Sequence, residues 1–280
     1  MTRKRLITIA HSPDSDDAFM FYALKHKKIM SPNYKFEIHR RDIEELNRLA
    51  VDCVYDVTAL SVHAYAYLHD KYALTSSGAS MAEKDYGPLL VSKKKYARAD
   101  LKHLTVAVPG EWTTAFLVLK IIEPAIKHMA MPFHQILSAV SQGSADAGLI
   151  IHEGQLQYEG LGFYKVLSLI DEWNRMSGGL PLPLGGSAVK KALGMTAVRE
   201  IADLQKKSIV YAMDHPDEAR EYARSFKRDL TMAEADKYLS WYANQRSVDM
   251  GPEGIRAIDF LFEIAFKKGL IPAKVSVETV

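Results

Sequence analysis

The 280-residue sequence has few of the features that mark several common protein classes. It contains one cysteine, Cys53, which excludes an intrachain disulfide and a metal site built from cysteines. Its 36 basic and 34 acidic side chains give a formal net charge of +2. The two signs are interspersed, unlike the basic stripe of a nucleic-acid-binding surface. We therefore expect no nucleic-acid partner.

Long apolar runs are absent too. A membrane-spanning helix needs about 18 or more apolar residues in sequence, and the chain has no such run. After the basic start, the apolar segment Leu6–Ala10 is interrupted by His11–Asp14, which makes it too short for a secretion signal. We expect a cytoplasmic protein with no membrane partner. The hydrophobic fraction of 48% is enough for a substantial core.

Strand and helix patterns alternate along most of the chain, which predicts an α/β architecture with mainly parallel sheets. The segment Leu180–Gly186 is rich in proline and indicates an extended linker. Helices are expected at Pro132–Val140 and at Asp203–Met213. Passages near residues 90–97 and 180–187 look like crossings between two lobes. The expected lobes are residues 1–93 with 188–280, and an inserted lobe, 94–187.

Polar residues follow four of the predicted strands: Ser12–Asp14, Thr58–Ser61, Pro109–Thr114 and His152–Glu153. The carboxyl ends of parallel strands face the ligand crevice, so these groups predict a cleft between the lobes. His152 carries an imidazole, whose unperturbed pKa of about 6.5 lets such a group accept a proton at neutral pH without special tuning. The alternative is a structural histidine that happens to end a strand.

The turn from Gly110 to Thr114 precedes a predicted helix and offers free N–H groups to an anion. We expect the amides near Thr113 and Thr114 to hold a substrate carboxylate. Ordinary helix capping by Thr113 explains the same residues equally well.

Several sharper motifs are missing. His152-Glu153 has no second histidine at the helical spacing of a zinc protease, and Asp14–Asp17 lacks the glycine and final glutamate of a calcium loop. No dinucleotide fingerprint, P-loop or Gly-x-Ser-x-Gly elbow occurs. We expect no metal and no cofactor.

Taken together, these segments resemble the 1,4-dihydroxy-6-naphthoate synthases of the futalosine route to menaquinone. The run Ser12–Phe19 resembles their Ser-Pro-x-x-x-Asp-x-Phe opening. Further matches are Leu60-Ser61, Val108–Gly110, Thr113–Ala115, Gly148–Glu153, Leu180–Gly185, Asn244, Ser247, Asp249, Gly251 and Gly254.

The resemblance implies a two-lobed fold like that of type II periplasmic binding proteins. It also implies a carbon–carbon lyase that converts cyclic dehypoxanthine futalosine, a small carboxylate, to 1,4-dihydroxy-6-naphthoate and dihydroxyacetone. His152 matches the family's proton acceptor. The positions that the resemblance assigns to substrate binding are Ala59, Leu60, Ser61, Thr113, Thr114 and Ala115.

The chain departs from the commoner family opening at Asp14, Ser15, Asp16 and Ala18, and it has Ala59 where some members have lysine. Two other functions stay open. A non-catalytic solute-binding protein would use the same fold and cleft. Chorismate dehydratase also shares the fold, but its usual Tyr-Leu-Asn opening does not follow the first predicted strand. The role of Glu153 and the oligomeric state stay undetermined.

Overall fold

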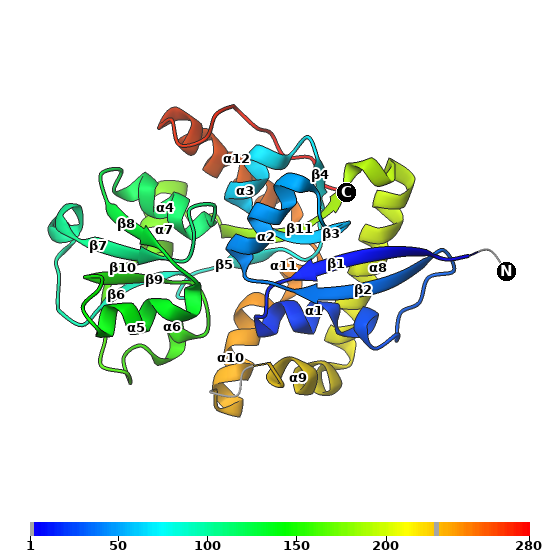
Figure 1. Ribbon diagram of the computed structural model, residues 1–280, viewed down its shortest axis with the longest axis horizontal. Helices are drawn as coiled ribbons and strands as arrows, with labels where there is room; N and C mark the ends of the chain where they lie inside the picture. Colours follow the sequence, from blue (N-terminus) through cyan, green and yellow to red (C-terminus); the bar gives the residue numbers. More distant parts are fainter. Residues whose placement is uncertain (1–2, 227–229) are drawn as a thin grey trace.

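The computed structural model describes residues 3–226 and 230–280, which form two β-sheets placed side by side with helices packed around them (Figure 1). The predicted α/β class with two lobes is therefore confirmed. Strand ends that carry polar residues meet between the two sheets.

The first sheet has the strand order β2-β1-β3-β11-β4, and β5 pairs with β11. Strand β1 is parallel to β2 and β3, whereas β11 runs antiparallel to β3, β4 and β5. The strands are β1 (Arg5–His11), β2 (Tyr34–Arg40), β3 (Val57–Ser61), β4 (Tyr72–Leu74), β5 (Ser80–Ala82) and β11 (Leu182–Lys190).

The second sheet has the order β10-β6-β9-β7-β8. Strand β7 is parallel to β8 and β9, whereas β6 is antiparallel to β9 and β10. The strands are β6 (Leu89–Ser92), β7 (Thr105–Val108), β8 (Lys127–Ala130), β9 (Ala147–Ile150) and β10 (Tyr164–Ser168). Both sheets are thus mixed, and the expectation of mainly parallel sheets is wrong for β6 and β11.

The proline-rich segment expected to be a linker is instead the start of β11. Leu182 is buried, and Pro183 stands opposite Met81 of β5. The pairing shifts register between Pro183 and Gly185. A bulge of this kind accommodates proline, which cannot donate to a regular ladder. Sequence rules that exclude proline from strand interiors therefore missed this strand.

Twelve α-helices occur in the described residues. They are α1 (Ser15–Lys25), α2 (Ile43–Leu49), α3 (Val62–Leu68), α4 (Thr114–Ile122), α5 (Ile136–Ser141), α6 (Gly154–Gln157), α7 (Leu169–Ser177), α8 (Met195–Asp214), α9 (Pro216–Arg224), α10 (Met232–Tyr242), α11 (Gln245–Val248) and α12 (Gly251–Lys267). The helix expected at Asp203–Met213 is longer than predicted. The one expected at Pro132–Val140 begins as a 3₁₀ turn, Phe133–Gln135, and continues as α5.

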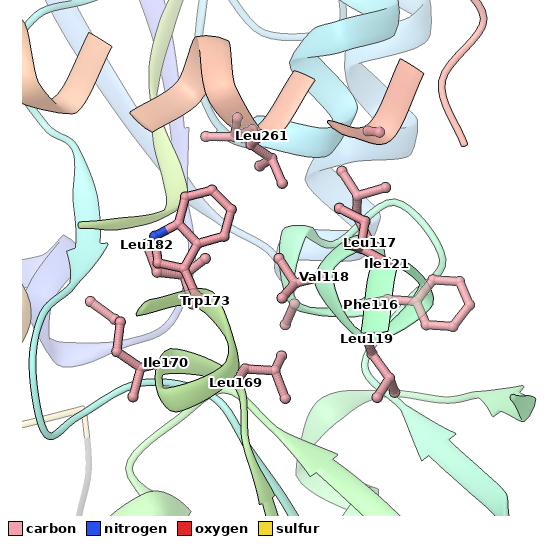
Figure 2. Packing of buried hydrophobic residues seen from close by; sticks show 14 of the residues in the cluster. Phe116, Leu117, Val118, Leu119, Ile121, Leu169, Ile170, Trp173, Leu182 and Leu261 are labelled. Carbon is pink, nitrogen blue, oxygen red and sulfur yellow. The ribbon is translucent and has the colours of Figure 1, made fainter. Parts of the chain in front are cut away.

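The largest hydrophobic core runs through both lobes. Trp173 of α7 is fully buried, and its Nε1–H donates to the carbonyl oxygen of Leu180 at 2.7 Å. Figure 2 shows Trp173 between Ile170 and Leu182 and facing Leu261 of α12. Helix α12 also contacts α4 and β11. Helix α12 therefore contacts elements of both lobes.

The chain passes from the first sheet to the second between β5 and β6, and it returns between α7 and β11. The boundaries 93/94 and 187/188 stay a prediction. Strand pairing places β6 in the second sheet and all of β11 in the first, so both crossings precede those boundaries. Among the described helices, none is long and apolar enough to cross a membrane.

Candidate active site

A cavity lies between the two sheets, at the edge where polar strand ends meet. It encloses about 680 Å³, including space open to solvent. The lining residues come from both lobes: Ser12, Asp14, Asp16, Asp17, Ile43, Ala59, Leu60, Ser61, Gly78, Ser80, Pro88, Thr113, Thr114, Ala115, Ile151, Leu184, Gly185, Gly186, Tyr238 and Tyr242.

The structure brings together all six positions that sequence reasoning assigned to substrate binding. Residues 59–61 end β3, and residues 113–115 begin α4 from the opposite lobe. Asn47 of α2 fixes the end of β3, because its Nδ2 donates to Ser61 Oγ at 3.0 Å and its Oδ1 accepts from the Ser61 amide at 2.9 Å. Ser61 is therefore held rigidly at the cavity wall.

The start of α4 offers hydrogen-bond donors to the cavity. The hydroxyl of Thr113 caps the helix by accepting from the Phe116 amide at 3.4 Å, as the sequence predicted. The hydroxyl of Thr114 donates to the Leu184 carbonyl at 2.5 Å. Within residues 3–226 and 230–280, no acceptor is bound to the amides of Thr114 and Ala115. These two amides lie at the positive end of the α4 dipole and suit a carboxylate.

A carboxylate of the protein itself already occupies the turn before α4. Glu44 Oε2 accepts from the amide of Trp112 at 3.0 Å, and Glu44 Oε1 accepts from Arg48 Nε at 2.9 Å. Glu44 belongs to α2 in the first lobe, so this bond links the lobes. Burial raises the pKa of Glu44, and the Trp112 amide opposes that rise. The expected anion site at this turn is thus divided. The Trp112 amide is bound to Glu44, and the Thr113 amide, which we expected to hold the carboxylate, donates to the Gly110 carbonyl at 3.4 Å, which leaves the amides of Thr114 and Ala115 for a ligand.

His152 follows β9 and lies beside the cavity rather than on its wall. Its neighbour Ile151 lines the cavity, while the imidazole is half-buried and packs against Phe133 with ring centroids 5.1 Å apart. The Gly154 amide donates to His152 Nδ1 at 3.0 Å. A neutral imidazole with an accepting Nδ1 carries its hydrogen on Nε2. Acceptance of a proton at Nε2 therefore requires that the hydrogen move to Nδ1 and the Gly154 bond break.

Gly154 permits this close approach. A Cβ at this position would lie 2.8 Å from His152 Cε1, a distance that forces the ring to shift. The short α6 therefore begins with a residue small enough to hold the imidazole beside its first turn.

Glu153 faces the opposite lobe. It is 2% exposed, and its Oε1 accepts from the hydroxyl of Ser15 at 3.3 Å. Ser15 begins α1, so Glu153 meets the first lobe where α1 starts. Asp17 Oδ2 accepts from the Ser12 amide at 2.8 Å, and Asp14 Oδ2 accepts from the Ser12 hydroxyl at 3.0 Å. A group of carboxyl side chains thus forms one side of the cavity.

Sequence reasoning missed the tyrosines of α10, Tyr238 and Tyr242, which also line the cavity. Tyr242 donates from its hydroxyl to Gln155 Oε1 at 3.2 Å, again linking the lobes. Burial raises the pKa of both tyrosines. In the sequence, the two tyrosines are four residues apart in a helix that begins with a clear capping box. This spacing places both on the same face of the helix and was the signal that could have identified them.

A second histidine lies near the cavity. Burial lowers the pKa of His63 to about 4, so its ring is neutral at physiological pH. Its backbone amide donates to the hydroxyl of Thr114 at 3.2 Å. No group of three or more His, Cys, Asp or Glu side chains in the described part of the chain is placed to hold a metal ion.

Comparison with known proteins gives both a family and a fold. Residues 7–267 match the family model described as menaquinone biosynthesis. A 1,4-dihydroxy-6-naphthoate synthase of Thermus thermophilus is 36% identical over 94% of this chain and 95% of the relative. A synthase of the same name from Streptomyces coelicolor is 33% identical over 95% of each chain.

Solved structures agree with the two-lobed architecture. A crystal structure of an Archaeoglobus fulgidus protein superposes with a TM-score of 0.90 at 42% identity, covering 95% of this chain and 98% of that one. The alkanesulfonate-binding protein of Xanthomonas axonopodis pv. citri has a TM-score of 0.73 at 12% identity, over 99% and 98% of the two chains, which shows the periplasmic-binding-protein fold alone. The chain therefore belongs to the menaquinone biosynthesis family that includes the 1,4-dihydroxy-6-naphthoate synthases.

Proposed function

We propose that this protein is a 1,4-dihydroxy-6-naphthoate synthase, a carbon–carbon lyase that acts on cyclic dehypoxanthine futalosine and releases dihydroxyacetone. The observation that carries the proposal is the match to two synthases across about 95% of the chain. The cavity between the lobes supports it, because the six expected substrate-binding residues all line that cavity. A biosynthetic enzyme of this kind works in the cytoplasm.

The site can provide two functions that the reaction needs, binding of the substrate carboxylate and removal of a proton. The amides of Thr114 and Ala115 bind the substrate carboxylate at the start of α4. His152 removes a proton made acidic by a neighbouring carbonyl, which leads to carbon–carbon cleavage and formation of the aromatic ring. A positioned general base contributes about 10²- to 10⁴-fold to the rate. Closure of the two lobes excludes water around the reacting atoms.

Purified protein incubated with cyclic dehypoxanthine futalosine tests the proposal. We expect 1,4-dihydroxy-6-naphthoate and dihydroxyacetone to appear in equal amounts by mass spectrometry. The similarity to solute-binding proteins makes binding without turnover the outcome to exclude. Tight binding of the substrate with no product would support a binding protein. Consumption of chorismate instead would indicate a dehydratase.

A further inference from the structure

One side of the cavity is built from carboxyl groups that the proposed mechanism does not use. Asp14 and Asp16 lie where β1 leads into α1, and both line the cavity. Glu153 comes from the other lobe and meets the same region through its hydrogen bond with Ser15. The opposite side presents hydroxyls and the amides of α4. The cavity therefore has an acidic side and a side that attracts anions.

Asp16 differs from the acidic residues beside it. It is only 5% exposed, and it lines the cavity. Among the described residues, no hydrogen-bond partner reaches its Oδ1 atom. By contrast, Asp17 accepts from the Ser12 amide. A buried polar atom without a partner costs about 1–3 kcal/mol, so an unsatisfied carboxyl on a residue that lines a cavity indicates a group that a ligand can satisfy.

We propose that Asp16 binds the uncharged, hydroxyl-bearing end of the substrate through its carboxyl group. The substrate's carboxylate then lies at the opposite side, on the Thr114 and Ala115 amides. This inference rests on the proposed function, in which the hydroxyl-bearing fragment leaves as dihydroxyacetone. The acidic side repels the substrate carboxylate, so the substrate can enter in one orientation only.

The surroundings of Asp16 favour its neutral form. Burial raises its pKa well above the ordinary value for aspartate, and Asp17, Asp14 and Glu153 raise it further. The titratable groups that face it from α1, from the segment after β9 and from α10 are Asp14, Asp17, Glu153, Tyr238 and Tyr242. A protonated carboxyl donates from its O–H and accepts at its other oxygen, so it can pair with a hydroxyl or a carbonyl of the substrate.

Two substitutions at Asp16 and two ligands test this assignment. Asp16→Asn keeps a neutral side chain with a donor and an acceptor, whereas Asp16→Leu removes both. The substrate carries the hydroxyl-bearing end, whereas the product 1,4-dihydroxy-6-naphthoate keeps the carboxylate and lacks that end. The control is Asp203→Asn on α8, because Asp203 is 57% exposed and pairs only with Lys207 in the described structure.

We expect Asp16→Leu to raise KM for the substrate by about 10- to 100-fold and to leave the product Kd within about twofold of wild type. Asp16→Asn restores KM to within about fivefold. Because asparagine does not titrate, Asp16→Asn should also remove any rise in KM with pH that loss of the Asp16 proton causes in the wild type. We expect Asp203→Asn to have the wild-type KM for the substrate and the wild-type Kd for the product.

Equal weakening of substrate and product binding by Asp16→Leu would show that Asp16 only shapes the cavity, and unchanged binding of both would exclude any role. Turnover of the substrate by the wild type is measured in the same experiment, and it tests the proposed function independently of the role of Asp16. If the wild type binds the substrate without converting it, the substrate Kd replaces KM and the comparison with the product still decides the role of Asp16. If the wild type does not bind the substrate, the inference fails with the function on which it rests.

Discussion

Replacement of Gly110 by alanine tests the bond between Glu44 and the turn before α4. A Cβ at position 110 would lie 2.4 Å from the Cγ, Cδ and Oε2 atoms of Glu44. The carboxylate must therefore leave, and its hydrogen bond to the Trp112 amide is lost. A hydrogen bond to a charged group contributes about 1.5–3 kcal/mol. The φ of +150° at Gly110 adds strain of about 1–3 kcal/mol for alanine.

We therefore expect Gly110→Ala to lower the free energy of unfolding by about 2.5–6 kcal/mol. Glu44→Ala alone should lower it by about 1.5–3 kcal/mol. In the double variant the steric conflict is gone, so Gly110→Ala adds only the backbone strain. The double variant should then be more stable than the sum of the single effects predicts, by about 1.5–3 kcal/mol.

Urea unfolding followed by tryptophan fluorescence and circular dichroism measures all four proteins, and agreement between the two probes checks that a single transition is observed. Effects that add to within about 0.5 kcal/mol would refute the reasoning, because they would mean that the Glu44 carboxylate does not occupy the turn in solution. A matched change at Gly143 is a control, because Gly143 also has a positive φ, +76°, but a Cβ there meets nothing within 4 Å.

Three further predictions follow from the site and the core. His152→Ala should lower kcat by about 10²- to 10⁴-fold in the turnover assay, and full activity would exclude its role as a base. Because burial raises the pKa of Asp16, the folded protein holds a proton that the unfolded chain releases above the ordinary carboxyl pKa, so stability falls as pH rises. Asp16→Asn should therefore be more stable than wild type near neutral pH, with a gain that disappears in acid, and urea midpoints that do not differ would contradict this. Trp173→Ala should cost about 3–5 kcal/mol in urea unfolding, since it removes a fully buried ring, and a loss below about 1 kcal/mol would contradict the packing in Figure 2.

The features that the sequence predicted correctly depend on local chemistry. Thr113 caps α4, as its place before the predicted helix indicates. The polar residues that follow β1, end β3 and follow β7 line one cavity, because parallel strands bring their carboxyl ends to the same edge, whereas His152 lies beside that cavity. These rules need only neighbouring residues and the general geometry of an α/β sheet.

The features that escaped prediction depend on contacts between distant segments. Glu44 has the sequence signature of an ordinary acidic residue in the first turn of a helix, yet its partner Trp112 lies in the other lobe. Likewise, Asp16 suits a helix start, and nothing local shows that it is buried against Glu153. Strand β8 was missed because its side chains are mostly exposed and show no apolar alternation.

The two lobes contact each other through an apolar region and through a polar region. We expect the apolar contacts to determine stability and the polar contacts to determine substrate binding. Around Trp173 the contact is apolar and continuous, and opening it would expose area worth about 25 cal/mol per Å². On the cavity side the contacts are single hydrogen bonds, such as Glu44 with Trp112 and Ser15 with Glu153. Replacing one of these hydrogen bonds by hydrogen bonds to water costs a net free energy of about 0.5–3 kcal/mol. A substrate should therefore enter by parting the polar side while the apolar side stays packed. For a given loss of stability, substitutions on the polar side such as Glu44→Ala should therefore change KM more than substitutions in the apolar core do.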